Sequence, residues 1–331
     1  APMAGVSTPA MAAAVSRSGA PGSIGIGAVD ALAARRMIDA VRAETSAPFN
    51  VNVFCHRPAV ANAAVEAAWI ARLAPEFAAF GALPPRALSE IYRSFVVDDA
   101  MLDLLAEIRP PVVSFHFGLP GEAAIRTLRR AGSVLLASAT NLDEARQIED
   151  AGLDAIVAQG WEAGGHRGSF DPDRPDDRLG TIALTRLLVR NVRVPVVAAG
   201  GIMDGAGIAA VLALGAAAAQ LGTAFVACDE SMADAGHRAA LGGDGARHTV
   251  MTRVLSGRPA RCLGNRFTRL GLEDRDVDVP AYPIAYDLGK ALHAAAKARG
   301  ELGFGAQWAG QGAPLVRPMP VASRATPPMP K

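Results

Sequence analysis

Short runs of apolar residues alternate with helical patterns along most of this chain. Each run is bounded by glycine, proline or polar residues, which is typical of parallel β-strands buried on both faces. The segments between the runs repeat apolar residues at helical spacing. We predict eight strands, at residues 2–6, 23–28, 49–54, 112–117, 134–139, 155–159, 195–199 and 218–224. The clearest helices are predicted at residues 30–44, 121–131, 142–151, 181–191 and 205–214.

Helix start signals support this pattern. Thr8 stands before Pro9, and Asn141 and Asp204 stand where the following helices should begin. Eight β/α units within residues 1–228 match the size of a TIM-type (β/α)8 barrel, which is the α/β fold we predict. An open doubly wound sheet is the alternative, but no GxGxxG motif opens a first helix.

The segments outside this repeat indicate how the chain is divided. The barrel is predicted to span residues 1–228, with an excursion at residues 55–111 that contains amphipathic helices around 61–80 and 86–108. Residues 229–313 follow the last strand and are predicted to form a smaller lid or substrate domain that packs on the barrel mouth. The proline-rich tail, residues 314–331, is expected to be extended or mobile.

Composition narrows the possible partners. The 33 Lys and Arg residues nearly balance 32 Asp and Glu residues, so no global field attracts nucleic acid or an acidic membrane. The apolar stretch at residues 207–228 is interrupted by polar residues and glycines, which favours a buried helix and strand over a membrane span. The three cysteines lie far apart without metal-site spacing. We expect a soluble, cytoplasmic protein with no structural metal; its oligomeric state stays open.

The candidate chemistry is concentrated at residues 159–168, QGWEAGGHRG, directly after a predicted strand. Gly164 and Gly165 would let the main chain pass close to a flat ring or a phosphate, and His166 can exchange a proton near neutral pH. We therefore predict that His166 is catalytic or contacts a ligand. Glu162 and Arg167 can equally form a surface ion pair, so neither is assigned a chemical step.

The glycines after the last two predicted strands indicate a phosphorylated cofactor. Gly200 and Gly201 follow one strand, and Gly222 and Thr223 end the next, at the loops where barrels commonly bind phosphate. The alternative is that these glycines only make tight turns.

Further polar side chains fall on the predicted strands. Asn50 and Asn52 share one strand face, and with Gln159 they offer amides that could bond the polar edge of a flavin. A strand-end cap is the alternative for the asparagines. His116 lies in an otherwise apolar run, where a histidine is as readily a satisfied core residue as a catalyst.

Tyr282, Tyr286 and Lys290 are spaced by four residues and would share one face of a helix. Because proline is tolerated only in the first turn of a helix, Pro283 must lie close to the start of that helix. Such a face offers two phenols and a cation to an anionic substrate. An ordinary amphipathic packing face is the alternative.

Taken together, several segments resemble the nitronate monooxygenases, formerly 2-nitropropane dioxygenases, and in particular the bacterial class I members. The resemblance covers nearly the whole chain, and EAGGHRG and HFGLP are its most specific motifs. The other segments that carry it are APMAGVSTP, NVNVFCHRPA, VVAAGGIMDGAGIAAVLALGA, AAQLGTAFVACDES, LGNRF and WAGQGAP.

The resemblance implies a barrel that binds FMN non-covalently under a lid. His166 and His116 match the family's active-site histidines, and Tyr282, Tyr286 and Lys290 match its substrate positions. The residues implied to surround the flavin are Met3, Ala4, Gly5, Asn52, Gln159, Gly164, Gly165, Gly200, Gly201, Gln220, Leu221, Gly222 and Thr223.

The implied reaction is oxidation of an alkyl nitronate, propionate 3-nitronate for class I, by FMN and O2. Its products are a carbonyl compound and nitrite or nitrate. The alternative is an FMN-dependent NADH:quinone reductase or enoyl-thioester reductase on the same barrel. Family members usually begin earlier than this chain, so we expect either a truncated sequence or a short first strand.

Overall fold

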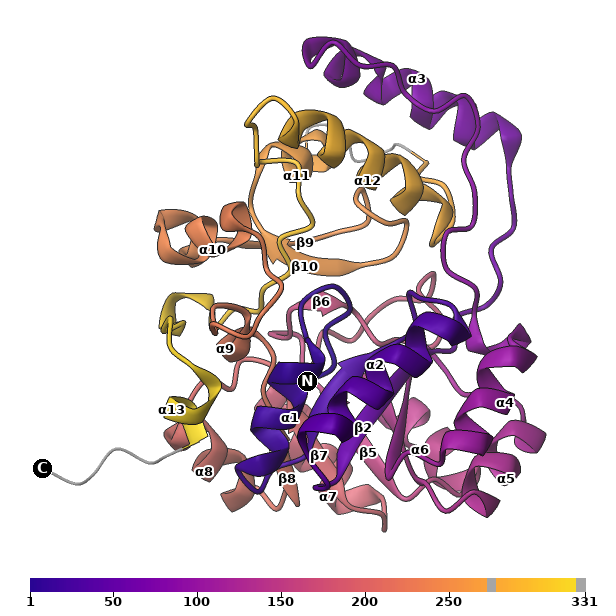
Figure 1. Cartoon of the computed structure of the whole chain (residues 1–331), viewed down its shortest axis with the longest axis vertical. Helices are drawn as coiled ribbons and strands as arrows, with labels where there is room; N and C mark the ends of the chain where they lie inside the picture. Colours follow the sequence, from indigo (N-terminus) through magenta and orange to yellow (C-terminus); the bar gives the residue numbers. More distant parts are fainter. Residues whose placement is uncertain (273–277, 326–331) are drawn as a thin grey trace, which may run out of the picture.

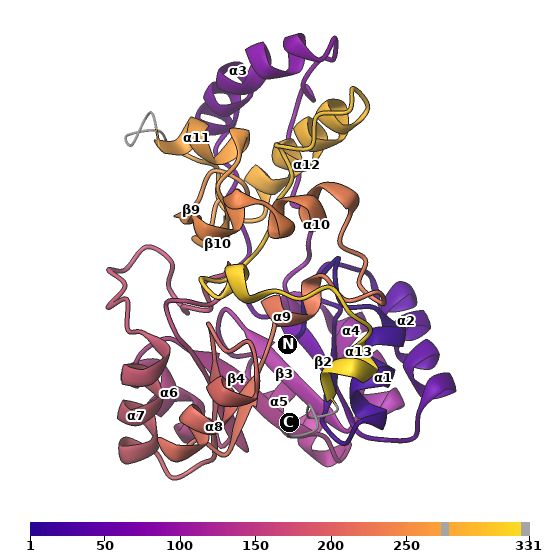
Figure 2. The same ribbon diagram turned by 90° about the vertical axis from the view of Figure 1, so that its left-hand side faces the viewer.

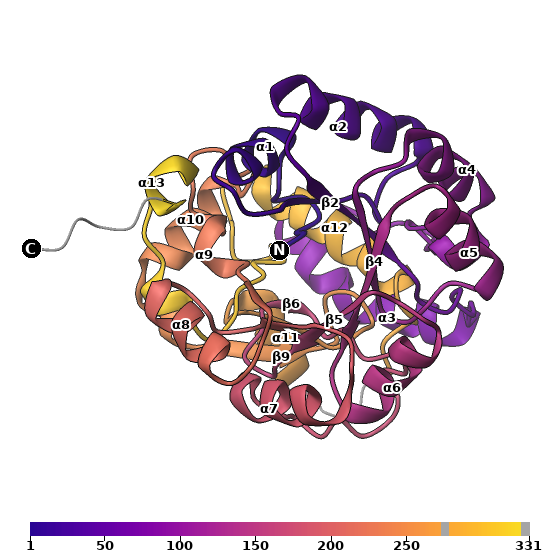
Figure 3. The same ribbon diagram turned by 90° about the horizontal axis from the view of Figure 1, so that it is seen from below.

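The computed structural model describes residues 1–272 and 278–325. Its centre is a curled parallel sheet of seven strands in the order β1-β2-β3-β4-β5-β7-β8, and helices surround the outside of the sheet (Figures 1 and 3). This confirms the predicted TIM-type α/β fold. The strands are β1 (Gly22–Gly25), β2 (Phe49–Phe54), β3 (Val112–His116), β4 (Val134–Ala139), β5 (Ala155–Gln159), β7 (Val196–Ala199) and β8 (Ala218–Gln220).

Three of the helices that flank this sheet begin at the caps that the sequence predicts. The side chains of Thr8, Asn141 and Asp204 each accept a hydrogen bond from a main-chain N–H in the first helical turn, as N-caps do. The flanking helices are α1 (Pro9–Arg17), α2 (Ala31–Glu44), α4 (Asp99–Ile108), α5 (Glu122–Arg130), α6 (Leu142–Asp150), α7 (Thr181–Asn191), α8 (Gly205–Ala213), α9 (Thr223–Val226) and α13 (Val321–Ala325).

The predicted strand at residues 2–6 is wrong. The Met3 carbonyl accepts hydrogen bonds from the N–H groups of Val6 and Ser7, at 3.0 and 2.8 Å, and Gly5 has a left-handed φ of 75°. These contacts close a turn, which an extended strand cannot contain. The turn lies beside the ends of both outer strands, because Ala4 is adjacent to Gly25 of β1 and residue 1 bonds the Leu221 carbonyl after β8.

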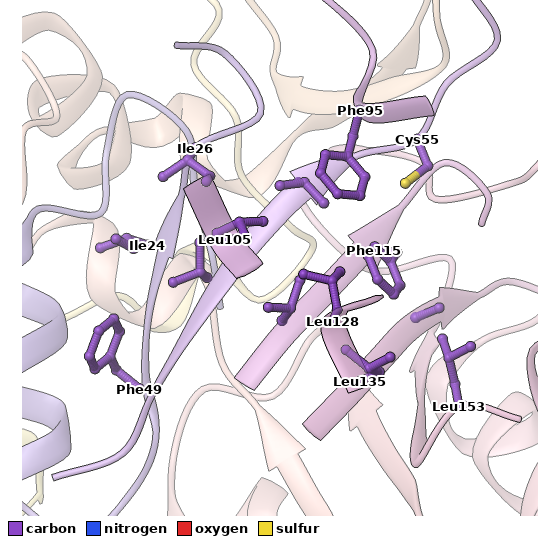
Figure 4. Packing of buried hydrophobic residues seen from close by; sticks show 14 of the residues in the cluster. Ile24, Ile26, Phe49, Cys55, Phe95, Leu105, Phe115, Leu128, Leu135 and Leu153 are labelled. Carbon is purple, nitrogen blue, oxygen red and sulfur yellow. The ribbon is translucent and has the colours of Figure 1, made fainter. Parts of the chain in front are cut away.

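Side chains alternate between the two faces of the sheet. On β2 and β3, Val51, Val53 and Phe115 belong to the hydrophobic core under the helices. Figure 4 shows Phe115 there with Phe49. Burying each such side chain stabilises the fold by about 1.5–3 kcal/mol. Asn52 and Ser114 point the other way and bond each other at 2.9 Å, so the interior of the barrel is polar at this end.

A second layer, which we call the cap, lies over one end of the barrel (Figures 1 and 2). Its sheet has the order β6-β10-β9, and β6 is supplied by the Gly165–His166 segment of the candidate motif, which pairs antiparallel with β10. The cap comprises β6 (Gly165–His166), β9 (Thr249–Thr252), β10 (Ala260–Leu263), α3 (Ala63–Ala79), α10 (Ala235–Gly242), α11 (Arg266–Leu272) and α12 (Ile284–Lys297).

The excursion between β2 and β3 contributes to the cap through α3, which packs against α12. The predicted helix at residues 86–108 is wrong in its first half, because α4 begins only at Asp99 with Asp98 as its N-cap. Before it, Tyr92 and Phe95 are buried and a short 3-10 turn runs over Phe95–Val97. Tyr92 packs with Phe117 and Tyr282, whereas Phe95 packs into the core under the barrel helices. A single continuous helix would need both rings on one buried face.

The expectation of an extended or mobile tail does not hold for residues 321–325, which form α13. Val321 of α13 is fully buried and packs with Met11 and Cys228, so α13 is fixed against α1. Residues 326–331, the rest of the predicted tail, lie outside the described residues.

Candidate functional site

A cavity of about 390 Å³ lies between the ends of the barrel strands and the cap, a volume typical of small-molecule sites. Elements distant in the sequence meet there, because parallel strands all end at the same rim of a barrel. The predicted site residues that line it are Met3, Ala4, Gly5, Asn52, His116, Gln159, Gly164, Gly165, His166, Gly200, Gly201, Gln220, Gly222, Thr223, Tyr282, Tyr286 and Lys290.

Leu221 is the exception among the predicted residues. Its side chain packs against the cluster formed by Ala198, Ile202 and Val211, because consecutive residues at the end of β8 point to opposite faces. Its neighbours Gln220 and Gly222 line the cavity instead. The side chain of Leu221 therefore does not line the cavity, unlike the other residues implied to surround the flavin.

His166 is enclosed by aromatic rings. The ring centroids of Trp308, Tyr282 and Phe117 lie 5.0, 5.2 and 5.7 Å from that of His166. Its Nε2 lies 2.9 Å from the Ser256 hydroxyl. Burial, reinforced by the charge of Arg258, lowers the pKa of His166 to about 3, so the imidazole is neutral at physiological pH.

Both ring nitrogens of His116 are engaged by the protein. Nδ1 lies 3.0 Å from the Ser138 hydroxyl and Nε2 lies 3.2 Å from the His166 carbonyl oxygen. Burial lowers the pKa of His116 to about 4. The residue lines the cavity, but it also has the bonding of a satisfied core histidine, the alternative that the sequence left open.

The amide of Gln159 joins the same network. Its Nε2 donates to the His166 carbonyl at 3.0 Å, and its Oε1 accepts from the Gly168 N–H at 2.7 Å. Gln159 and His116 therefore hold the main chain of the candidate motif from below. This fixes where the His166 side chain enters the cavity.

Tyr282, Tyr286 and Lys290 reach the cavity from the cap. Tyr282 precedes α12, which begins at Ile284, so the three do not share one helix face as the spacing predicted. The Lys290 ammonium lies over the rings of Tyr92 and Tyr286, at 4.7 and 5.3 Å from their centroids. Burial raises the pKa of Tyr286 to about 12, so its phenol stays protonated.

The glycines after β7 form a tight turn and also leave main-chain donors for a phosphate, the two interpretations that the sequence allowed. Gly200 and Gly201 have φ values of 113° and 69°, which favour glycine, so they do make a tight turn. Within residues 1–272 and 278–325, the N–H groups of Gly201 and Gly222 donate to no protein acceptor. Both residues line the cavity, so free main-chain donors are available for a phosphate.

Glu162 and Arg167 do not form the surface ion pair that the sequence allowed. Arg167 is 2% exposed and binds Asp176 through Nε at 2.7 Å. Glu162 accepts from the N–H and hydroxyl of Thr181, at 2.8 and 2.9 Å. Both residues thus brace the motif from outside the cavity.

Sequence reasoning missed several residues of the site. Tyr92 comes from the excursion and Trp308 from the segment after α12, and both line the cavity. Phe117 lies in the HFGLP motif, but the sequence indicates no role for it. Its φ is 75°, which is unusual for an aromatic residue, and its ring centroid lies 5.7 Å from that of His166. Only an isolated aromatic residue marks each position, which is too weak a signal in one sequence.

In the described part of the chain, no cluster of three His, Cys, Asp or Glu side chains could hold a metal ion. No helix there is long and apolar enough to cross a membrane.

Comparisons with known proteins agree with this geometry. A family model described as nitronate monooxygenase matches residues 1–323. A nitronate monooxygenase from Paraburkholderia phytofirmans is 63% identical, covering 97% of this chain and 88% of the relative. One from Pseudomonas aeruginosa is 54% identical, covering 97% and 92%.

Solved structures show the same architecture. A nitroalkane oxidase from Streptomyces ansochromogenes superimposes with a TM-score of 0.89 at 42% identity, covering 98% of this chain and 91% of that one. FabK from Thermotoga maritima gives a TM-score of 0.73 at 31% identity, covering 98% and 88%.

Proposed function

Because the chain belongs to the nitronate monooxygenase family and is thus an oxidoreductase, we propose that it oxidises alkyl nitronates with O2 using bound FMN. Propionate 3-nitronate is the substrate we favour. The observation that carries the proposal is the meeting of His166, Lys290 and the glycine-rich strand ends around one cavity. The products would be a carbonyl compound and nitrite or nitrate.

The hydrogen-bond donors and glycines around the cavity support FMN as the cofactor. The free N–H groups of Gly201 and Gly222 suit the phosphate, and Gly200 and Thr223 adjoin them. Asn52 and Gln159 would face the polar edge of the ring, and residues 3–5 with Gly164, Gly165 and Gln220 would lie along the rest of the cofactor. When bound, FMN would accept electrons from the substrate and react with O2.

His166 is proposed to hold the nitronate. The Ser256 hydroxyl lies 2.9 Å from His166 Nε2 and 3.3 Å from the Arg258 carbonyl oxygen, and it has a single proton to donate. When Ser256 donates to Nε2, the proton of the neutral imidazole resides on Nδ1. Nδ1 can then donate to a nitronate oxygen.

The protonation state of His166 favours a substrate that is already ionised. A base whose pKa is about 3 removes a proton from a neutral nitroalkane poorly near neutral pH. Lys290 would meanwhile attract a substrate carboxylate, with Tyr282 and Tyr286 beside it. His116, whose nitrogens are occupied, is proposed to position the motif and to form part of the cavity wall.

The direct test is oxygen uptake by the purified protein. We expect a flavin spectrum, rapid uptake with propionate 3-nitronate, and slow uptake with neutral nitroethane. His166→Asn should lower kcat/KM for the nitronate by about 10- to 100-fold, the value of one hydrogen bond to a charged group. His248→Asn, which alters an exposed histidine outside the cavity, should have no effect.

The alternative reductase activity is tested on the same preparation. FabK from Thermotoga maritima shares this fold, and the test for the reductase is to mix the protein with NADH anaerobically. We expect no rapid loss of flavin colour. Rapid bleaching by NADH would favour the reductase, and a colourless protein that binds no FMN would contradict both functions.

A further inference from the structure

Arg258 is a buried cation that forms no ion pair with any carboxylate of the described residues. Its side chain is 3% exposed, and its guanidinium donates to the main-chain carbonyls of Arg167 and Ser169. The charges of Glu144 and Asp173 attract Arg258 without contact, because their oxygens bond other groups. Glu144 bonds Thr140 and Phe170, and Asp173 bonds Arg253. Burying an unpaired charge is costly, so its position requires a physical reason.

A single aromatic ring separates this cation from the cavity. The Arg258 guanidinium lies 4.2 Å from the centroid of the Phe117 ring, which itself lines the cavity. The centroids of Phe117 and His166 are 5.7 Å apart, with the rings perpendicular at 89°. A fixed positive charge therefore lies one ring behind the place where His166 meets a ligand.

The cavity contains nothing that cancels this charge. In the described part of the chain no aspartate or glutamate lines it, whereas Lys290 adds a second positive group from the cap. The main-chain carbonyl of Arg258 also lies 3.3 Å from the Ser256 hydroxyl that contacts His166. Because Ser256 has one proton and donates it to His166, the part of Arg258 that can act on a bound ligand is the charge of its guanidinium.

We propose that Arg258 is a positioning residue whose buried guanidinium, held behind Phe117, stabilises an anion bound beside His166. In a partly buried environment a unit charge acts over several ångströms without full screening by water. The inference deepens the proposed function, because it assigns selectivity for an anionic over a neutral ligand to one residue outside the cavity wall.

The test compares an anionic and a neutral probe by calorimetric titration of the purified protein. Nitrate is a planar oxyanion like a nitronate, and nitroethane in its neutral form is the uncharged probe. Arg258→Met should raise the Kd of nitrate about tenfold and leave that of nitroethane unchanged. Arg258→Lys, which keeps the charge, should bind nitrate within about threefold of the unaltered protein.

Arg247→Met is the matched control, because Arg247 is an exposed arginine just before β9 that pairs with Asp244. Neither of these two charges is among those that act on Arg258. It should not change either Kd. If Arg258→Met does not fold, Arg258→Gln replaces it, since its amide can still donate to the Ser169 carbonyl. An equal rise for both probes, or no rise for nitrate, would overturn the proposal.

The outcome is independent of turnover. Oxygen uptake with propionate 3-nitronate tests the proposed function, whereas nitrate binding tests Arg258. If the protein oxidises the nitronate but the Kd of nitrate is the same with and without the Arg258 side chain, only this inference is contradicted. A protein that shows the Arg258 effect without oxidising nitronates would contradict only the proposed function.

Discussion

At the scale of single residues, two buried arginines lie outside the cavity and contact the residues that form its wall. Arg167 anchors the candidate motif through Asp176 and the Gln159 carbonyl, and Arg258 lies behind Phe117. Nothing in the sequence distinguishes these two arginines from exposed ones. Their burial follows from the long loop after β6, which folds over them and supplies carbonyl and carboxylate partners.

Replacing Arg167 should destabilise the fold strongly. Arg167→Met leaves the Asp176 carboxylate without its buried partner, a loss of about 3–5 kcal/mol in the free energy of unfolding. Arg57→Met removes an exposed arginine from a 3.4 Å contact with Asp171 and should cost less than about 1 kcal/mol. Urea denaturation of both variants gives the comparison. Equal losses would contradict the role assigned to the buried pair.

At the scale of secondary-structure elements, the cap depends on helices that are far apart in the sequence. Trp69, Leu73 and Phe77 of α3 are buried against Leu288 and Leu292 of α12. The spacing of four between the α3 residues puts them on one face of the helix. The excursion therefore supports α12, which carries Tyr286 and Lys290 to the cavity.

Shortening a side chain between α3 and α12 should make the cap unfold more readily than the barrel. Leu73→Ala should lower the stability of the cap by about 2–5 kcal/mol, the usual cost of such a cavity. Hydrogen exchange should then show faster exchange in α3 and α12 and unchanged protection in β2 to β5. Ala71→Ser, on the exposed face of α3, should change stability by no more than about 0.5 kcal/mol. Uniformly faster exchange would show that cap and barrel unfold together.

At the scale of the whole molecule, three neutral histidines are buried at the junction of barrel and cap. Burial, aided by the charge of Arg258, lowers the pKa of His56 and His116 to about 4 and that of His166 to about 3. An unfolded histidine titrates near 6.5. Between about pH 6.5 and pH 4 the unfolded chain therefore binds protons that the folded chain does not.

Stability should consequently fall as the solution is acidified. Each of these histidines contributes a loss of about 1.4 kcal/mol per pH unit below about pH 6.5, until the folded pKa is reached. Urea denaturation at about pH 7 and about pH 5 should show several kcal/mol of difference. His116→Gln should reduce the slope by about one histidine's share. A pH-independent free energy of unfolding would contradict the neutral buried state.

The pattern of apolar runs predicted most barrel strands correctly, because largely buried parallel strands are short and apolar wherever they occur in the chain. It failed at residues 2–6, where the run Pro2 to Val6 has the composition of a strand but turns at Gly5. It also missed β6, because two residues that pair with β10 leave no pattern of their own.

The sequence by itself determined the alternation of strands and helices, the glycines at the strand ends and the motif that holds His166. These features are local, since each depends on the burial or conformation of neighbouring residues. Only the tertiary structure decided that Tyr92 and Trp308 line the same cavity as His166, that Leu221 turns away, and that Arg258 lies behind Phe117. Such convergence depends on how distant segments pack together, which a periodic pattern in one chain does not encode.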